Sequence, residues 1–363
     1  MRPDDPAQIQ YTSGTTGFPK GAVLHHRGLV ANAYLVHRRA EFPMHGTWLT
    51  ALPLFHTAGC AMAVLGTATS QGTLVLGRFF EPGMLLAAAE KWRANFIGGV
   101  PAMVGAMLAH PALPVTDLSA LEVVASGGDT VPAEMVRAAE ERMGARFSTV
   151  YGQTEASPII TQTSPFDSDE AKAETAGRPL DHVDVKIADP VTGRTQPCGE
   201  PGEVCARGYQ VMAGYLALPD ATAETIDADG WLHTGDLGTM DARGFLRITG
   251  RIKDMIIRGG ENIYPREVEA ALVEHPTVAE ALVVGLPSEE WGETVAAVVK
   301  PADPAAPPTT AELRAHVREQ LAPHKTPQDW FLMEQFPVNA MGKLQKFLVR
   351  DAITAGRLDR LPG

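Results

Sequence analysis

Short apolar runs of strand length alternate with runs of helix length over the first half of the chain. Strands are predicted at 47–55, 72–77, 95–99, 120–125 and 147–151, and helices at 84–93 and 132–143. Strands and helices that alternate at this spacing are typical of βαβ units and a mainly parallel sheet. We therefore expect residues 1–170 to form an α/β structure.

The pattern changes between about residues 175 and 250. The runs VDVKIA, GEVCAR and GFLRIT are separated by the turn signals DPVTG, DADG and DARG. Short strands between frequent turns indicate a compact antiparallel region. Residues 171–251 are therefore predicted as a β-rich, barrel-like part of one large domain that spans 1–251.

A second change predicts a separate small α+β domain at 252–363. The segment PREVEAALVEH begins with Pro265, a residue favoured in the first turn of a helix. Two strand-like runs follow, and then the Pro/Ala-rich loop 301–308. Thr309 and Glu312 form a capping-box pattern ahead of a helix whose apolar residues share one face, namely Leu313, Val317 and Leu321.

Composition narrows the classes of function. A chain of 363 residues with 45% hydrophobic residues is long enough for two globular domains. The net charge of −12, from 31 basic and 43 acidic residues, and the lack of a basic cluster argue against nucleic acid and anionic membranes as partners. The apolar stretches are too short to span a bilayer, and the opening MRPDDPAQIQ lacks the pattern of a secretory signal. Cys60, Cys198 and Cys205 show neither metal-ligand spacing nor a disulfide framework, so we expect a reduced, cytoplasmic protein.

Residues 11–21 read YTSGTTGFPKG and combine hydroxyl groups, glycines and one lysine. Glycines let backbone N–H groups turn inward, hydroxyls add donors, and Lys20 adds a positive charge, which together suit a polyphosphate. The spacing is not that of the Walker loop, because Pro19 occupies the position of its second glycine. A flexible surface turn has the same composition, so composition alone leaves both readings open.

The segment YTSGTTGFPKG resembles the signature phosphate loop of the AMP-binding, adenylate-forming superfamily, which includes acyl-CoA synthetases. Further segments resemble the family's motifs in the family's order: LPLFHTAG, YGQTEASP, GWLHTGDLG with GRIKDMIIRGGENIYPREVE, and PVNAMGKLQK. The resemblance covers essentially the whole chain. It implies the adenylate-forming fold, with a large domain and a small C-terminal domain.

The resemblance also implies a two-step reaction of the acyl-CoA synthetase type. A carboxylate attacks the α-phosphate of ATP, giving an acyl-adenylate and pyrophosphate, and the thiol of CoA then takes the acyl group and releases AMP. ATP, Mg²⁺ and CoA are the implied cofactor and substrates. The first step brings two anions together, so the site must supply positive charge and fixed donors.

The motifs place the implied nucleotide contacts on particular residues. The β- and γ-phosphates would be held by Thr12, Ser13, Gly14, Thr15, Thr16, Gly17 and Lys20. The adenine would lie against Gly127, Gly128, Asp129 and Tyr151. Thr154 would bond the α-phosphate, and Glu155 would hold Mg²⁺ through oxygen ligation.

Three further residues match family positions near the reacting groups. Asp236 and Arg251 would hold the ribose hydroxyls, since a carboxylate can accept two hydroxyl protons. Lys343 matches the catalytic lysine, whose ammonium would bridge the incoming carboxylate and the α-phosphate.

The family also rotates its small domain between the two half-reactions. Lys253 matches the hinge, where a few backbone torsions absorb the rotation. Gly259 and Gly260 would then let the pantetheine arm of CoA pass close to the backbone.

The identity of the acid is only partly indicated. His56 matches a position at the mouth of the acyl pocket, with an ordinary core or surface histidine as the alternative. The segment LFHTAG offers no aspartate for an amino-acid ammonium, and no carrier-protein segment follows the small domain, which favours a stand-alone acyl-CoA synthetase. Small, flexible residues at 98–108 and 156–160 suit a medium- or long-chain fatty acid, with an aryl acid as the alternative.

The chain departs from the family pattern at its start. Family members carry roughly 150 or more residues before the phosphate loop, whereas here the loop begins at Tyr11, which we expect at the end of a strand. A start codon assigned too far downstream, a deliberately shortened polypeptide and a naturally short protein each fit this difference. Uncovered sheet faces would favour a homo-oligomer or aggregation. The alternative function is a catalytically impaired, nucleotide-binding or assembly partner.

Overall fold

The computed structural model describes residues 1–12, 19–338 and 344–362, and the chain forms two compact units. The larger unit comprises Met1–Thr234 and Gly238–Ile248, and the smaller comprises Gly235–Leu237 and Thr249–Gly363. Within the described residues, no helix has both the length and the apolar character that crossing a membrane requires.

A seven-stranded sheet organises the larger unit, with the strand order β4-β3-β5-β6-β7-β8-β9. The five strands from β4 to β7 are parallel, and β8 and β9 add an antiparallel edge. This arrangement confirms the predicted α/β class with a mainly parallel sheet. The strands are β3 (Thr47–Thr50), β4 (Thr73–Leu76), β5 (Phe96–Gly99), β6 (Val123–Gly127), β7 (Arg146–Gly152), β8 (Ile159–Gln162) and β9 (Arg178–Pro179).

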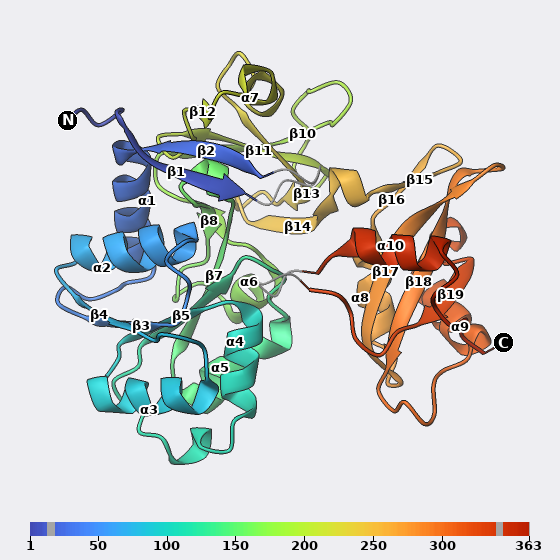
Figure 1. Ribbon diagram of the computed structural model, residues 1–363, viewed down its shortest axis with the longest axis horizontal. Helices are drawn as coiled ribbons and strands as arrows, with labels where there is room; N and C mark the ends of the chain where they lie inside the picture. The colour runs from blue at the N-terminus through green and yellow to red at the C-terminus, as the bar shows by residue number, and fades with distance from the viewer. Residues whose placement is uncertain (13–18, 339–343, 363) are drawn as a thin grey trace. The chain divides into compact units, whose positions relative to one another are not determined.

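Helices cover both faces of this sheet (Figure 1). Alternate residues of a strand point to opposite faces, so Leu49 packs on one core and Trp48 on the other. Leu49 faces helices α3 (Pro82–Trp92), α4 (Pro101–Ala109) and α5 (Ala133–Met143). Trp48 faces helices α1 (His26–Arg39) and η1 (Ala58–Leu65, a π-helix), and α2 (Gly66–Thr69) follows η1.

Two predicted strands differ from the structure by more than one residue at an end. The strand expected at 47–55 ends at Thr50, because the Leu52 N–H donates to the Thr50 hydroxyl (3.0 Å) and Pro53 has no N–H for a sheet ladder. The strand expected at 120–125 is β6, which starts at Val123 after a turn closed by the Leu121 N–H on the Leu118 carbonyl (2.8 Å). Local hydrogen bonds therefore set where β3 ends and where β6 begins.

A three-stranded sheet forms at the start of the chain. Strands β1 (Pro6–Thr12) and β2 (Lys20–His25) form an antiparallel hairpin, and β12 (Gly214–Tyr215) joins the other edge of β2. The Thr12 end of β1 confirms the strand expected to include Tyr11.

A four-stranded sheet confirms the β-rich region. Its order is β10-β11-β13-β14, with strands β10 (Val183–Ala188), β11 (Gly202–Gly208), β13 (Leu232–Met240) and β14 (Leu246–Arg251). Helix α7 (Pro219–Thr225) lies in the connection that leads to β13. In the large sheet, the short helix α6 (Asp169–Glu174) lies between β8 and β9, and 3₁₀ turns occur at Leu113–Val115 and Thr154–Ala156.

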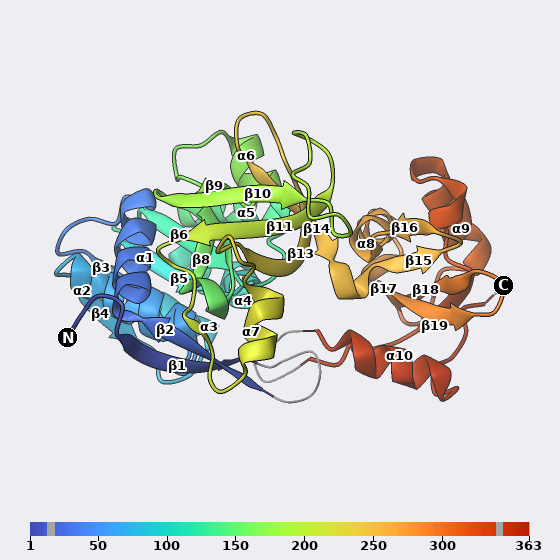
Figure 2. The same cartoon turned by 90° about the horizontal axis from the view of Figure 1, so that it is seen from above.

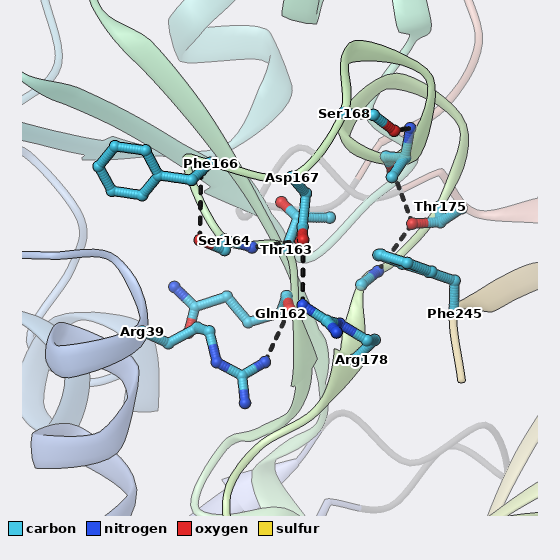
Figure 3. A network of polar contacts seen from close by, with 12 residues as sticks. Arg39, Gln162, Thr163, Ser164, Phe166, Asp167, Ser168, Thr175, Arg178 and Phe245 are labelled. Atoms are coloured by element: carbon cyan, nitrogen blue, oxygen red, sulfur yellow. Dashed lines mark hydrogen bonds and ion pairs between the residues drawn. The ribbon is translucent and has the colours of Figure 1, made fainter. Parts of the chain in front are cut away.

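Polar contacts fix the antiparallel edge of the large sheet (Figure 3). The Asp167 carboxylate pairs with the Arg178 guanidinium at 3.1 Å, and Arg39 from α1 donates to the carbonyl oxygens of Gln162 and Pro179. These contacts tie the loop after β8 to β9 and to α1. The edge beside strand β7, which leads into the YGQTE motif, is thereby held in place.

The smaller unit is an α+β structure, as predicted. Helices α8 and α9 pack on one face of its sheet and α10 on the other (Figure 2). Pro265 is the first residue of α8, and Thr309 and Glu312 form the predicted capping box. The elements are β15 (Ile256–Arg258), β16 (Glu261–Ile263), α8 (Pro265–Val273), β17 (Val278–Ser288), β18 (Gly292–Pro301), α9 (Thr310–Gln320), β19 (Asp329–Leu332) and α10 (Lys346–Thr354), with 3₁₀ turns at Ile252–Asp254 and Pro323–Lys325.

Candidate functional site

The hairpin of β1 and β2 positions the two ends of the predicted phosphate loop. Thr12 and Lys20 are directly paired across the hairpin, and the Thr12 hydroxyl donates to the Lys20 carbonyl at 3.3 Å. The other predicted phosphate contacts, Ser13, Gly14, Thr15, Thr16 and Gly17, lie outside the described residues, as does Lys343. The sheet therefore fixes where the loop leaves and returns.

A tyrosine that sequence reasoning missed joins two of the predicted site residues. The Lys20 ammonium lies 4.4 Å from the ring centroid of Tyr215 in β12, and the Tyr215 hydroxyl donates to the Glu155 carboxylate at 2.7 Å. Burial, followed by the nearby Glu155 charge, raises the pKa of Tyr215, so its hydroxyl remains a donor. One side chain thus contacts both a cation and a carboxylate of the candidate site.

The backbone of Glu155 is also held in place, in addition to the contact of its side chain with Tyr215. It is buried, and its backbone carbonyl accepts from the Met212 N–H at 2.8 Å. The turn that carries it needs glycine at Gly152, where a Cβ would lie 1.9 Å from the Pro158 carbonyl oxygen. Thr154 begins this turn and is half-buried beside Glu155.

The predicted adenine contacts lie at the carboxyl ends of two neighbouring parallel strands. Gly127 ends β6 and is paired with Val150 of β7, one residue before Tyr151. A Cβ on Gly127 would lie 2.1 Å from the Val150 carbonyl oxygen, so only glycine fits. Gly128 follows with φ +82°, and Asp129 is exposed. Open α/β sheets bind ligands at this edge, so the structure brings these predicted residues together in a suitable place.

His56 lies two residues before the first residue of the π-helix η1, with Thr57 between them as the N-cap. Its Nδ1 accepts from the Ala58 N–H at 3.1 Å, and its side chain is half-buried. Mid-chain π-helical turns frequently occur at functional sites. The ring is therefore held at the entry of a helix whose first turn also carries Cys60.

In the smaller unit, Asp236 and Arg251 form an ion pair. Arg251 Nε lies 2.9 Å from Asp236 Oδ1, at the end of β14, and Asp236 is buried. A guanidinium that orients a carboxylate leaves a planar acceptor in a fixed direction. The structure therefore brings both predicted ribose contacts together.

Lys253 lies just beyond β14, in the 3₁₀ turn Ile252–Asp254, and is exposed. Gly259 and Gly260 form the turn between β15 and β16, with φ +60° and +86°. A Cβ on Gly259 would lie 2.8 Å from the ring of Trp291, which is 44% exposed. Trp291 is a second neighbour of the predicted site that no sequence pattern indicated.

Two family models match this chain. Residues 1–216 match the model described as AMP-binding enzyme, and residues 267–343 match the AMP-binding enzyme C-terminal domain. The first match covers more than half of the chain. The chain belongs to the AMP-binding enzyme family.

Curated members of this family support the same assignment. The chain is 43% identical over 349 residues to the putative acyl-CoA synthetase YngI of Bacillus subtilis (strain 168), covering 96% of this chain and 63% of YngI. It is 41% identical over 347 residues to a feruloyl-CoA synthase from an Amycolatopsis species, covering 96% of this chain and 70% of that protein. The chain thus spans about two thirds of the length of these relatives.

Solved structures place the fold among adenylate-forming enzymes. The crystal structure of ATP-bound MatB from Rhodopseudomonas palustris superimposes with a TM-score of 0.92 at 32% identity, covering 98% of this chain and 70% of MatB. The AMP-binding enzyme family therefore accounts for both the motifs and the architecture.

Proposed function

We propose that this chain activates a carboxylic acid with ATP, forming an acyl-adenylate and pyrophosphate, and then transfers the acyl group to the thiol of CoA with release of AMP. The observation that carries the proposal is the Lys20–Tyr215–Glu155 contact, next to the carboxyl ends of β6 and β7. A fixed cation and a fixed carboxylate are the groups needed to bind a metal–polyphosphate. Membership of the AMP-binding enzyme family supports the same reaction.

The phosphates would lie between the hairpin and the YGQTE turn. Lys20 would offset charge on the β- and γ-phosphates, with Thr12, Ser13, Gly14, Thr15, Thr16 and Gly17 supplying hydroxyl and backbone donors. Thr154 would donate its hydroxyl to the α-phosphate. Bringing donors to fixed positions before reaction lowers the cost of moving an anion toward another anion.

The residues present fit Mg²⁺. A hard cation prefers oxygen ligands, and Glu155 offers a buried carboxylate oriented by Tyr215. Bound Mg²⁺ would offset charge on the phosphate oxygens. The ATP-bound state of MatB supports nucleotide as the ligand of this fold.

The remaining nucleotide would be held at two further places. Gly127, Gly128, Asp129 and Tyr151 would contact the adenine, and the Asp236 carboxylate, oriented by Arg251, would accept the ribose hydroxyl protons. Lys343 would bridge the attacking carboxylate and the α-phosphate. Rotation at Lys253 would then bring Gly259 and Gly260 to the path of the CoA thiol.

We propose an apolar acid of medium or long chain as the substrate, with His56 at the mouth of its pocket, in a cytoplasmic enzyme. An aryl acid is the second candidate, favoured by the similarity to a feruloyl-CoA synthase. A panel of aliphatic and aryl acids separates the two.

Two assays on the purified chain test the proposal. The first measures carboxylate-dependent ATP–pyrophosphate exchange, and the second measures CoA-dependent AMP release over the acid panel. We expect both activities, and we expect Glu155→Gln to abolish exchange while Glu170→Gln, an exposed carboxylate on α6, leaves it unchanged. A folded, monodisperse chain without either activity would instead favour a nucleotide-binding or assembly partner.

A further inference from the structure

A cluster of three different ligand types lies on the β-rich sheet, apart from the nucleotide residues. Glu203 and Cys205 are two positions apart on β11, so their side chains share one face, and His233 reaches them from the neighbouring strand β13. One ligand atom from each of the three lies within 4.8 Å of the others. Cys205 is fully buried and Glu203 nearly so, whereas the His233 side chain is 29% exposed.

The histidine lies between two carboxylates. Its Nδ1 is 2.7 Å from Glu203 Oε2, and its Nε2 is 3.5 Å from Asp227 Oδ2. A neutral imidazole has only one N–H, so it can donate to only one of these carboxylates. The other nitrogen faces an anion, and a second proton or a metal cation between the two would make this contact favourable.

The position of the Cys205 thiol helps to distinguish a second proton from a metal cation. Cys205 Sγ lies 3.6 Å from His233 Nδ1. A proton on the imidazole would satisfy Glu203 and Asp227 and leave the thiol with its weak hydrogen bond to the Glu203 carbonyl oxygen, at 3.9 Å. A soft or borderline metal cation would use all three ligand atoms.

The distances suit a tetrahedral metal. Ligand bonds of about 2.3 Å to sulfur and about 2.05 Å to nitrogen place the two atoms about 3.6 Å apart at a tetrahedral angle. This equals the Cys205–His233 separation. The same geometry needs about 3.3 Å between nitrogen and oxygen, so the Glu203 carboxylate would move by about 0.6 Å from its hydrogen-bonded position.

The neighbouring basic side chains have other partners. Lys186 is paired with Cys205 across β10 and β11, but its ammonium lies 4.5 Å from the Trp231 ring centroid. Arg207 stacks on the same ring and pairs with Asp184 at 3.0 Å. Positive charge on this face is therefore directed toward Trp231 and Asp184.

We propose that Glu203, Cys205 and His233 bind one Zn²⁺ ion, with a water in the fourth position on the exposed side of His233. Asp227 accepts from the opposite ring nitrogen and holds the imidazole with Nδ1 toward the metal, as outer-shell carboxylates do at zinc sites. The ion links β11 to β13. This site is separate from Glu155, the proposed Mg²⁺ ligand, and does not depend on the proposed ligase reaction.

Metal binding to the chelator-stripped chain tests the proposal without an activity assay. We expect one equivalent of Zn²⁺ to be taken up in competition with a chromophoric chelator. Co²⁺ at the same site is expected to give tetrahedral visible bands and a thiolate charge-transfer band. A chain that takes up no metal, or Co²⁺ spectra without the thiolate band, would refute the site.

Variants assign the ligands. Cys205→Ser is expected to remove the charge-transfer band and the tight Zn²⁺ equivalent, while Cys198→Ser, at an exposed cysteine, retains both. Asp227→Asn is expected to weaken Zn²⁺ binding by about 10–100-fold. Equal Zn²⁺ binding by Cys205→Ser and the original chain would mean that Cys205 is not a ligand, and would refute this site. The Co²⁺ spectrum of the unaltered chain decides the matter even if a variant fails to fold.

Discussion

The Tyr215 hydroxyl hydrogen-bonds to the Glu155 carboxylate at 2.7 Å, while the face of the same ring lies 4.4 Å from the Lys20 ammonium. The ring thus separates a cation and a carboxylate that would otherwise be free to pair with each other.

Tyr215→Phe keeps the ring under Lys20 and removes only the hydroxyl. A hydrogen bond to a charged group contributes about 1.5–3 kcal/mol, so we expect ATP–pyrophosphate exchange to fall by about 10–100-fold and to need more Mg²⁺. Titrating Mg²⁺ in the exchange assay measures both effects. Tyr34→Phe, at a half-exposed tyrosine of α1, is the control. An equal loss of exchange activity in both variants would mean that Tyr215 has no specific role in the candidate site.

Asp236→Asn is expected to weaken nucleotide binding through the ribose. The amide is a poorer acceptor than a carboxylate held by Arg251, so ATP affinity is expected to fall about 10-fold or more. The variant is also expected to distinguish ATP from 2′,3′-dideoxy-ATP less well, which competition binding measures. Asp241→Asn, in the following turn, is the control. If Asp236→Asn distinguished ATP from 2′,3′-dideoxy-ATP as well as the original chain does, the ribose would not be bound by Asp236.

Lys343→Ala tests the two half-reactions separately. Loss of one transition-state donor is expected to slow adenylation by about 10²–10³-fold, while thioester formation from supplied acyl-adenylate survives. Lys300→Ala, at a lysine paired with Glu280, is the control. An equal fall in both half-reactions would contradict the assigned role.

Lys253→Pro restricts the backbone just after β14. We expect slower thioester formation with adenylation preserved, because in the proposed cycle only the second step needs rotation of the backbone there. Lys253→Ala controls for loss of the side chain. Single-turnover measurements give the rate of each step separately. Equal reductions in the rates of adenylation and thioester formation would argue against a hinge at Lys253.

His37 is expected to make folding stability depend on pH. Burial against Trp48 and Phe42 lowers its pKa from 6.5 to about 3, so the folded chain keeps this ring neutral where the unfolded chain protonates it. The contribution of the neutral ring to the free energy of unfolding is therefore fully present above about pH 6.5. It is lost progressively toward pH 3, and about 2 kcal/mol of it is lost by pH 5. Urea unfolding at several pH values, compared with His37→Gln, measures this. Parallel curves for both proteins would exclude His37 as the cause.

Local signals predicted the elements that local chemistry determines. Pro265 begins α8 and Thr309 caps α9 because these residues act on the adjacent turn. Helix α1 was not predicted, since its core face carries buried polar residues. Asn32 exchanges hydrogen bonds with the backbone of Ile159, and His37 stacks on Trp48, so the apolar periodicity is diluted.

Residues of the candidate site could be predicted from the sequence only where they belong to a family motif. Motif resemblance assigns Lys20 and Glu155 to the candidate site, but nothing near Tyr215 in the sequence indicates contact with residues so distant in the chain. Likewise, linear spacing gave Cys205 no metal partners, because His233 comes from a different strand. Contacts that depend on sheet order require the folded chain.

The pairing of β2 with β12 has a consequence for synthesis of the protein. Val23 is made almost two hundred residues before its strand partner Gly214. At 5–20 residues per second, a ribosome needs roughly 10–40 s to cover that interval. During this time the nascent hairpin lacks its third strand and Lys20 lacks the Tyr215 ring, so this part of the candidate site cannot form until residue 215 has been made.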